Sequence, residues 1–278
     1  MKKKGNLSTI LLILVLIMGL SLLLYPTVSE AWNTRYHERT IDNYENAIAV
    51  IDKDQYKDLW EAAVAFNNRT RTGPSAFELS AEERRTYNTL LNLTKDGLMG
   101  YIEIPSLGIK LPIYHGTTDA VLQVGVGHLD WSSLPVGGEG THTIMSGHRG
   151  LPSARLFTDL DQLQEGDTFV LHILNEVLTY EVDQVLIVLP DATEALHIEE
   201  GKDLCTLVTC TPYGVNSHRL LVRGHRVENG VQSVKVRVTA DALRVSSLGV
   251  AAVLYVPMLF LFLGAQSLLE RNTKRKKP

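Results

Sequence analysis

The stretch Asp203-Leu-Cys-Thr-Leu-Val-Thr-Cys210 is rich in apolar and β-branched residues, and it is followed by Thr211-Pro-Tyr-Gly214 and then by His218-Arg-Leu-Leu-Val-Arg-Gly-His225. The first run predicts a buried strand. The Pro-Tyr-Gly segment is typical of a turn. The second run therefore predicts a strand that pairs beside the first one across this turn.

Two arginines in the second strand are candidate site residues. Successive side chains alternate between the faces of a strand, so Leu220 and Val222 should face the core while Arg219 and Arg223 share the other face. Arg219 follows Cys210 by nine residues. A guanidinium close to a nucleophile can hold a developing oxyanion or orient a substrate carbonyl, whereas the ordinary alternative is a solvated surface arginine.

The chain has 2 cysteines, Cys205 and Cys210, both in the first strand. Five steps along a strand cover roughly 16 Å, whereas a disulfide needs Cα atoms within about 7 Å, so the two cannot bridge each other. A free thiol in an exported domain is usually either buried or catalytic. Cys205 fits burial, and Cys210, where the strand opens into a loop, is a candidate nucleophile. No motif implies a metal or a cofactor.

A cysteine attacks as its thiolate, which a nearby imidazolium stabilises, so a histidine partner is expected. Among the nine histidines, His148 lies in Ser146-Gly-His-Arg-Gly150, where a strand leaves into a glycine-rich loop. His142 precedes it by six residues on the same strand. Alternation puts both histidines on one face and does not choose between them.

The chain after Gly97 consists of short apolar runs separated by Gly, Pro and Asn. Seven or eight strands in about 130 residues predict a β-barrel or a sandwich. Short helices are expected at about 120–126 and 154–163. The predicted strands are Met99–Ile104, Lys110–Tyr114, Thr141–Ser146, Thr168–Leu174, Leu178–Leu189, Leu204–Cys210 and Arg219–Val227.

The segment before the strands has the periodicity of amphipathic helices. Apolar residues recur at helical spacing from Asn33 to about Phe66, with an interruption near Lys53–Tyr56. The Gly-Pro pair that follows predicts a loop, and Ser80-Ala-Glu-Glu83 resembles a capping box that starts a helix through Leu93.

Two runs of 25 residues, Gly5–Ser29 and Val245–Leu269, contain no charged side chain. Each is long enough for a bilayer, which takes about 20 residues. Basic residues flank both runs on their outer sides, so both termini should be cytoplasmic and the segment between them exported. The first run also resembles a signal peptide, but its apolar length favours an uncleaved anchor.

About 215 residues lie between the two spans, enough for one domain. The acidic balance of this segment argues against nucleic acid as a partner. The expected order is a basic tail (1–6), a transmembrane helix (7–25), a helical segment (30–96) with a loop at about 69–79, a β-domain (97–230), a linker (231–244), a second transmembrane helix (245–269) and a basic tail (270–278).

Thr206-Leu-Val-Thr-Cys210 and the residues through Arg219 resemble the catalytic segment of sortases, closely that of the pilus-building class C. The match spans about Tyr87–Val227. Further segments that agree in order are Gly100-Tyr-Ile-Glu-Ile-Pro105, Leu111-Pro-Ile-Tyr-His-Gly116, Gly125-Val-Gly-His-Leu129, Ser133-Leu-Pro-Val-Gly-Gly138, Ser146-Gly-His-Arg-Gly-Leu-Pro-Ser-Ala154 and Leu156-Phe-Thr-Asp-Leu160.

The resemblance implies a closed eight-stranded β-barrel with short helices, preceded by a helical segment with a lid and flanked by two transmembrane helices. It matches Cys210 to the nucleophile, His148 to the acid/base and Arg219 to the substrate-positioning cation. His142 becomes a probable structural histidine. The implied reaction cleaves a Leu-Pro-x-Thr-Gly-like sorting signal between Thr and Gly through a thioacyl enzyme. In class C the acyl group then passes to a lysine of another pilin subunit.

The lid departs from the class C pattern, which commonly has Asp-Pro followed by an aromatic residue. Here the loop reads Arg71-Thr-Gly-Pro-Ser-Ala-Phe77, so Gly73 stands where the acidic residue is expected, before Pro74. The usual salt bridge from the lid to an active-site arginine therefore has no partner in this loop. We expect a weaker lid in which Phe77 still covers the cleft.

Three other functions fit parts of the pattern. A housekeeping sortase would transfer the surface protein to a cell-wall precursor, and a cysteine peptidase would release the product to water. A membrane-tethered scaffold would need no chemistry, with Cys210 a buried thiol and Arg219 a charge at the sheet edge. Replacement of Cys210 separates the scaffold from the enzymes, and the identity of the acceptor separates the enzymes from one another.

Overall fold

The computed structural model describes residues 5–68 and 78–230. The chain divides into two compact units, of which the larger spans Trp32–Lys235. The expected second span, linker and C-terminal tail (231–278) and the predicted lid positions Gly73, Pro74 and Phe77 lie outside the described residues.

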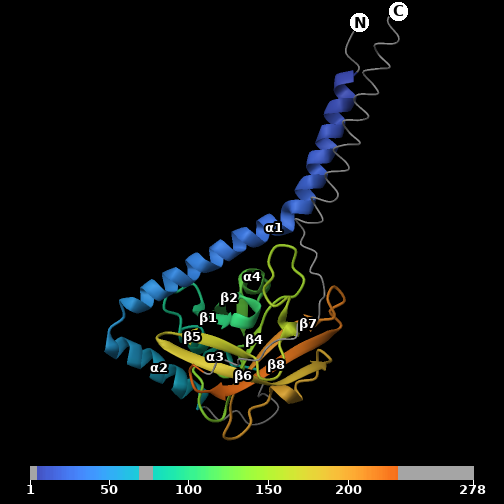
Figure 1. Cartoon of the computed structure of the whole chain (residues 1–278). Helices are drawn as coiled ribbons and strands as arrows, with labels where there is room; N and C mark the ends of the chain where they lie inside the picture. The colour runs from blue at the N-terminus through green and yellow to red at the C-terminus, as the bar shows by residue number, and fades with distance from the viewer. Residues whose placement is uncertain (1–4, 69–77, 231–278) are drawn as a thin grey trace, which may run out of the picture. The chain divides into compact units, whose positions relative to one another are not determined.

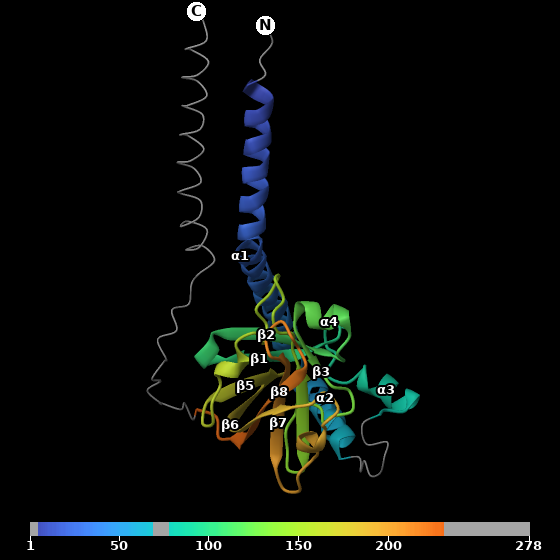
Figure 2. The ribbon, with the colours of Figure 1, turned by 90° about the vertical axis from the view of Figure 1, so that its right-hand side faces the viewer.

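Eight strands form one closed barrel in the order β1-β2-β3-β4-β7-β8-β6-β5 (Figures 1 and 2). The pairs β2–β3 and β4–β7 are parallel and the remaining pairs antiparallel. The barrel confirms the predicted fold class. Its strands are β1 (Leu98–Ile104), β2 (Ile109–His115), β3 (Val126–His128), β4 (Thr141–Ser146), β5 (Thr168–Ile173), β6 (Glu176–Val188), β7 (Asp203–Thr211) and β8 (His218–Val227).

Four α-helices precede or interrupt the strands: α1 (Gly5–Ala49), α2 (Lys53–Asn67), α3 (Ala81–Tyr87) and α4 (Asp119–Val124). The break between α1 and α2 falls just before the predicted one, because the Asp52 side chain caps α2 by accepting a 2.7 Å hydrogen bond from the Gln55 amide. The capping box of Ser80 and Glu83 is present at the start of α3.

Two helix predictions need correction. α3 ends at Tyr87 instead of continuing to Leu93, since the chain turns at Leu91, which has a positive φ of 55°. Over 154–163 only a single turn of 3-10 helix forms, Leu160–Gln162. The amide of Phe157 donates to the carbonyl of His148 instead of bonding within a helix.

The helical segment packs on the barrel through two sets of contacts. Ala63 and Phe66 of α2 join the buried cluster of the barrel interior. Tyr44 of α1 is fully buried, donates a 2.7 Å hydrogen bond to the carbonyl of Met99 and accepts one of 2.8 Å from the amide of Leu174. These contacts fix the second half of α1 to β1 and to the turn after β5.

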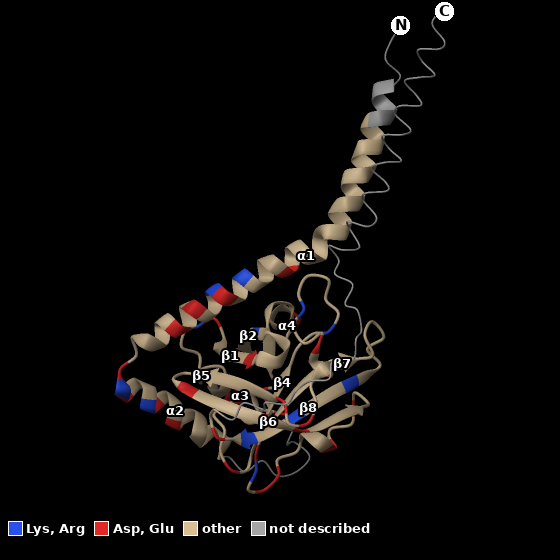
Figure 3. Ribbon diagram, in the orientation of Figure 1, with Lys and Arg blue, Asp and Glu red and all other residues tan. Residues whose placement is uncertain are grey.

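Within the described residues, one helix is long and apolar enough to cross a membrane, and its apolar part lies near the N-terminus. The sequence has no charged residue from Gly5 to Ser29, and Glu30 is the next one. In Figure 3 the described N-terminal part of α1 is accordingly tan, and blue and red appear only further along the helix. This matches the first predicted span by length and composition, as a membrane anchor or a signal sequence.

Candidate active site

The three predicted site residues come from three strands that are neighbours in the barrel. β7 lies between β4 and β8, and Cys210 pairs with Arg219 across β7 and β8. The parallel register of β4 and β7 ends at Ser146 opposite Val208, and the amide of Gly147 continues it with a 3.1 Å hydrogen bond to the Val208 carbonyl. His148, two residues beyond Ser146, is therefore level with Cys210.

Cys210 and Arg219 belong to the outer face of the sheet. Ile144, Val208 and Leu221 share an apolar cluster outside the barrel interior. Cys210 lies two residues from Val208 and Arg219 two residues from Leu221, so alternation places both on that face. His148 lies in the turn two residues beyond the end of β4. All three residues are half-buried, so a substrate can reach them.

The opposite face of β7 and β8 is the barrel interior. Leu220 and Val222 are buried there, as predicted from the alternation of β8. Cys205 is also fully buried, and burial raises the pKa of its thiol well above the usual value. The two cysteines are both free. Cys205 is thus a neutral core residue, and Cys210 is the cysteine that a substrate can reach.

A cluster of apolar side chains adjoins the site. We call it the outer-face cluster; its buried members are Ile144, Leu196 and Leu221, and its half-buried members are Leu129, Trp131, Leu186, Val188, Ala195 and Val208. Strands supply some of these residues and loops the others. Leu129 and Trp131 follow β3, and Leu196 ends the 3-10 turn Glu194–Leu196. Sequence periodicity could not identify the loop members because loops have no repeat.

Arg219 is held at the start of β8 by the adjoining turn. Its Nη1 donates hydrogen bonds to the carbonyls of Asn216 and His218, at 3.3 and 3.1 Å. Asn216 has a positive φ of 59°, so the turn presents its carbonyl in a fixed direction. These bonds occupy one nitrogen of the guanidinium, whose position in the register is opposite Cys210.

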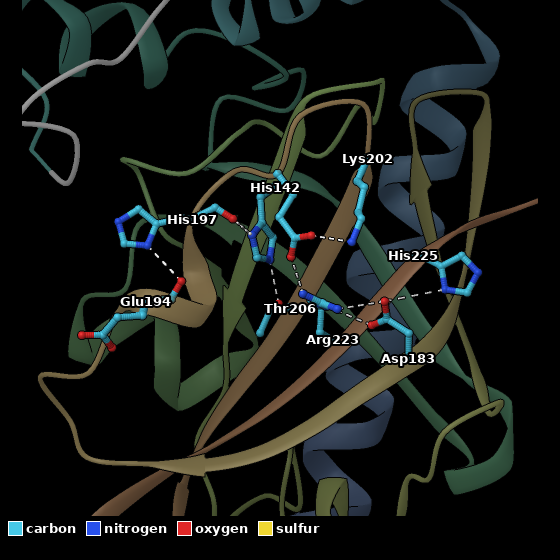
Figure 4. Close-up of polar contacts among 9 residues, drawn as sticks. His142, Asp183, Glu194, His197, Lys202, Thr206, Arg223 and His225 are labelled. Atoms are coloured by element: carbon cyan, nitrogen blue, oxygen red, sulfur yellow. Dashed lines mark hydrogen bonds and ion pairs between the residues drawn. The ribbon is translucent and has the colours of Figure 1, made fainter.

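His142, the other candidate on β4, takes part in a separate polar network on the same face (Figure 4). Its Nδ1 lies 2.8 Å from the carbonyl of His197 and its Nε2 2.7 Å from Oγ1 of Thr206. Burial is the largest effect on His142 and lowers its pKa, so the ring stays neutral. Both ring nitrogens are engaged in structural hydrogen bonds.

Arg223 anchors the rest of this network. Its Nε lies 2.9 Å from Oδ1 of Asp183 on β6, and its Nη1 lies 2.6 Å from Oε1 of Glu199 in the loop before β7. Glu199 also forms an ion pair with Lys202. Together with the bond from His142 to His197, these contacts tie the loop that carries Leu196 to the face of the sheet.

Comparison with known proteins identifies the family. A family model described as the sortase domain matches residues 102–227. The solved structure of sortase C1 from Streptococcus agalactiae is 53% identical, covers 69% of this chain and 99% of its own, and has a TM-score of 0.67. The chain belongs to the sortase family. Sortase C of Streptococcus pneumoniae is similar to this sortase at 41% identity, over 68% of this chain and 97% of that one, with a TM-score of 0.60.

Curated relatives agree over a shorter region. Sortase A of Bacillus anthracis is 32% identical over 136 residues, which are 49% of this chain and 63% of the relative. Sortase D of Bacillus subtilis is 33% identical, again over 63% of its own length. This sortase therefore aligns with less than two thirds of either relative.

Proposed function

We propose that this sortase is a membrane-anchored cysteine transpeptidase that cleaves a Leu-Pro-x-Thr-Gly-like sorting signal and transfers the acyl product to an amine. The observation that carries the proposal is the strand register: Cys210 on β7 pairs with Arg219 on β8, and the turn that carries His148 follows directly on the β4–β7 ladder. The outer-face cluster adjoins these positions through Val208 and Leu221. A thiol, an imidazole and a guanidinium are the three groups that acyl transfer from a peptide needs.

Each residue has a distinct role in the proposed reaction. The thiolate of Cys210 attacks the carbonyl carbon of Thr in the sorting signal, and the developing oxyanion is stabilised by the Arg219 guanidinium. His148 protonates the departing Gly amine, so the C–N bond breaks and a thioester remains. An incoming amine then gives a proton to His148, attacks the thioester and releases Cys210.

The outer-face cluster supports this assignment in two ways. Its apolar side chains suit the Leu and Pro of a sorting signal lying along the face towards Cys210. They also remove water from the neighbourhood of the site, which strengthens the interaction of Arg219 with a developing charge. A site with little water favours an amine over hydrolysis in the second step.

We further propose that the acceptor amine belongs to a lysine of another pilin subunit, so that repeated turnover builds a covalent fibre. Two of the similar solved structures, from Streptococcus agalactiae and Streptococcus pneumoniae, are sortases C, and that of Streptococcus pneumoniae has been described in terms of pilin substrate specificity. The helical segment before the barrel, with α1 and α2 packed on it, supports the same class. The alternative acceptor is the amine of a cell-wall precursor.

The proposed location is the cell membrane, with the catalytic barrel outside the cell. An apolar helix at the N-terminus and the charge-free run Val245–Leu269 would be the two spans. The basic clusters before the first run and after the second support cytoplasmic termini.

The test is an immunoblot of wall extracts from cells that carry Cys210→Ala. High-mass ladders that survive boiling in detergent should collapse to single subunits, while Cys205→Ala, which removes the other thiol, should retain them. If the ladders persist in Cys210→Ala while single surface proteins escape into the medium, the enzyme anchors proteins and does not polymerise them. If neither the ladders nor the anchoring changes, the proposed transpeptidase is wrong.

A further inference from the structure

The residues on either side of Cys210 and His148, the proposed catalytic pair, are joined by hydrogen bonds. Cys210 lies between Thr209 and Thr211, and His148 lies between Gly147 and Arg149. Oγ1 of Thr209 donates a 2.7 Å hydrogen bond to the carbonyl of Gly147. Nη1 of Arg149 donates one of 3.1 Å to Oγ1 of Thr211. The residues that precede Cys210 and His148 are therefore hydrogen-bonded to each other, and so are the residues that follow them.

Arg149 makes the second of these links from a nearly buried position. Its side chain is 10% exposed, and its other terminal nitrogen forms an ion pair with Asp161 in the segment that follows the His148 turn. Its Nε is buried with no hydrogen-bond partner among the described residues. A guanidinium in this environment carries a desolvation cost, which its bonds to Asp161 and Thr211 must offset.

These contacts connect three segments that are distant in sequence. Beyond Ser146, the His148 turn is no longer part of strand β4, so the strand ladder alone does not fix it. Arg149 ties the turn to the end of β7 at Thr211 and to the 3-10 turn at Asp161. The guanidinium is planar and has several donors, so it can hold both partners at once in one geometry, which an ammonium group cannot do.

We propose that Arg149 is a positioning residue that keeps His148 level with Cys210, a role that rests on the proposed transpeptidase function. It acts through the His148 turn and does not touch the scissile bond. Because its charge is paired with Asp161, its contribution is geometric: without the link to Thr211 the imidazole moves relative to the thiol. A displacement of about 1 Å between reacting groups can cost about 100-fold in rate.

The role predicts a defect in turnover with little change in substrate binding. In the full-length enzyme in detergent micelles, with a quenched fluorescent peptide containing Leu-Pro-Glu-Thr-Gly as the probe, Arg149→Gln should lower kcat by about 10- to 100-fold. KM should stay within about 2-fold, since the outer-face cluster is unchanged. Arg149→Lys keeps the charge but lacks the planar guanidinium, so its kcat should lie between those of Arg149→Gln and the parent enzyme.

A matched control lies in the same segment. Arg155 pairs with Asp159 as Arg149 pairs with Asp161, but its side chain is 50% exposed, against 10% for Arg149. Arg155→Gln should therefore leave kcat within about 2-fold, as expected for an exposed ion pair. Thr211→Val removes only the acceptor of the Arg149 bond at nearly constant volume, and it should lower kcat in the same direction. The double variant Arg149→Gln/Thr211→Val should be no slower than Arg149→Gln alone.

The outcomes separate the inference from the proposed function. If the parent enzyme does not cleave the peptide, the proposed function fails. If the parent cleaves and Arg149→Gln retains its kcat, or raises KM alone, the positioning role is wrong. Should Arg149→Gln fail to fold, Thr211→Val decides: an unchanged kcat in a folded Thr211→Val enzyme also overturns the role.

Discussion

Replacement of Gly147 by alanine should destabilise the barrel and disturb the site together. A Cβ at Gly147 would stand 2.6 Å from Cδ2 and 2.8 Å from Cγ of the Phe157 ring. Carbon atoms in contact prefer about 3.5–4.0 Å, so the ring must retreat by about 1 Å. Phe157 is fully buried in the barrel interior, so other core side chains enclose its ring.

The expected cost follows from this overlap. Forcing one extra methyl group into a packed core costs about 1–3 kcal/mol. In a unit of this size each kcal/mol lowers Tm by about 2–4 °C, so Gly147→Ala should lower Tm by about 2–12 °C. Cleavage of the peptide should also slow, because the residue that moves with the new methyl group is His148.

Thermal unfolding of the full-length protein in detergent, read by circular dichroism, measures the effect. Ser146→Ala, one residue earlier, is the matched control and should melt within about 1 °C of the parent, as most mild surface changes do. In Gly147→Ala/Phe157→Leu the smaller side chain makes room, so the loss should be smaller than the sum of the single losses by more than about 0.5 kcal/mol. An unchanged Tm for Gly147→Ala, or simple additivity in the double variant, would refute the steric argument.

Three further results are expected. Burial lowers the pKa of three histidines on the barrel strands, and that of His37 on α1, below the unfolded value of about 6.5. The unfolded chain therefore binds more protons below that pH, and the free energy of unfolding should fall as the pH drops from about 6.5 towards the folded pKa values, by up to about 1.4 kcal/mol per pH unit for each histidine. Denaturant titrations at several pH values test this, and a flat profile would contradict it. Arg223→Gln breaks the ion pairs to Asp183 and Glu199. After allowance for partial exposure, it should lower the free energy of unfolding by about 1–2 kcal/mol and speed hydrogen exchange in residues 193–202. Unchanged exchange would mean that the network does not hold this loop. Ser80→Ala removes the N-cap of α3 and should lower the stability of this helix by about 1 kcal/mol. The measurement is hydrogen exchange, which should become faster only in residues 81–87. Exchange as slow as in the parent protein would show that the cap is dispensable. The three histidines are His115, His142 and His172.

The sequence predicts the parts of the fold that repeat. Short apolar runs separated by Gly, Pro and Asn identified seven strands. Alternation within β8 identified the inward faces of Leu220 and Val222, because burial on one side of a strand leaves a period of two. The side-chain caps at Ser80 and Asp52 are local and follow from a few neighbouring residues. Residue spacing alone left His142 and His148 equivalent, and only the resemblance to sortases favoured His148.

The hydrophobic pattern of the sequence could not predict which distant strands pair with each other. The parallel register of β4 with β7 determines that His148 comes level with Cys210, yet nothing in either strand states which strand is its neighbour. β3 is only three residues long, too short to show a period. The predicted helix over 154–163 was wrong for a similar reason. The amide of Phe157 donates its hydrogen bond to the carbonyl of His148, a contact between two turns that the local sequence does not reveal.

The parallel pairing of β4 and β7 also governs when Cys210 and His148 come together during folding. Parallel neighbours need a long connection, and here that connection contains β5 and β6, two of the eight strands of the barrel. Loop-closure entropy delays contacts between such distant segments until the intervening chain has folded. A newly made chain therefore carries Cys210 without its histidine neighbour until β5 and β6 have been made and β7 pairs with β4. Under the proposed function, the acyl-transfer site is thus assembled by the same pairing that joins β4 to β7 in the barrel, and a chain that has not reached this stage lacks the arrangement that the reaction needs.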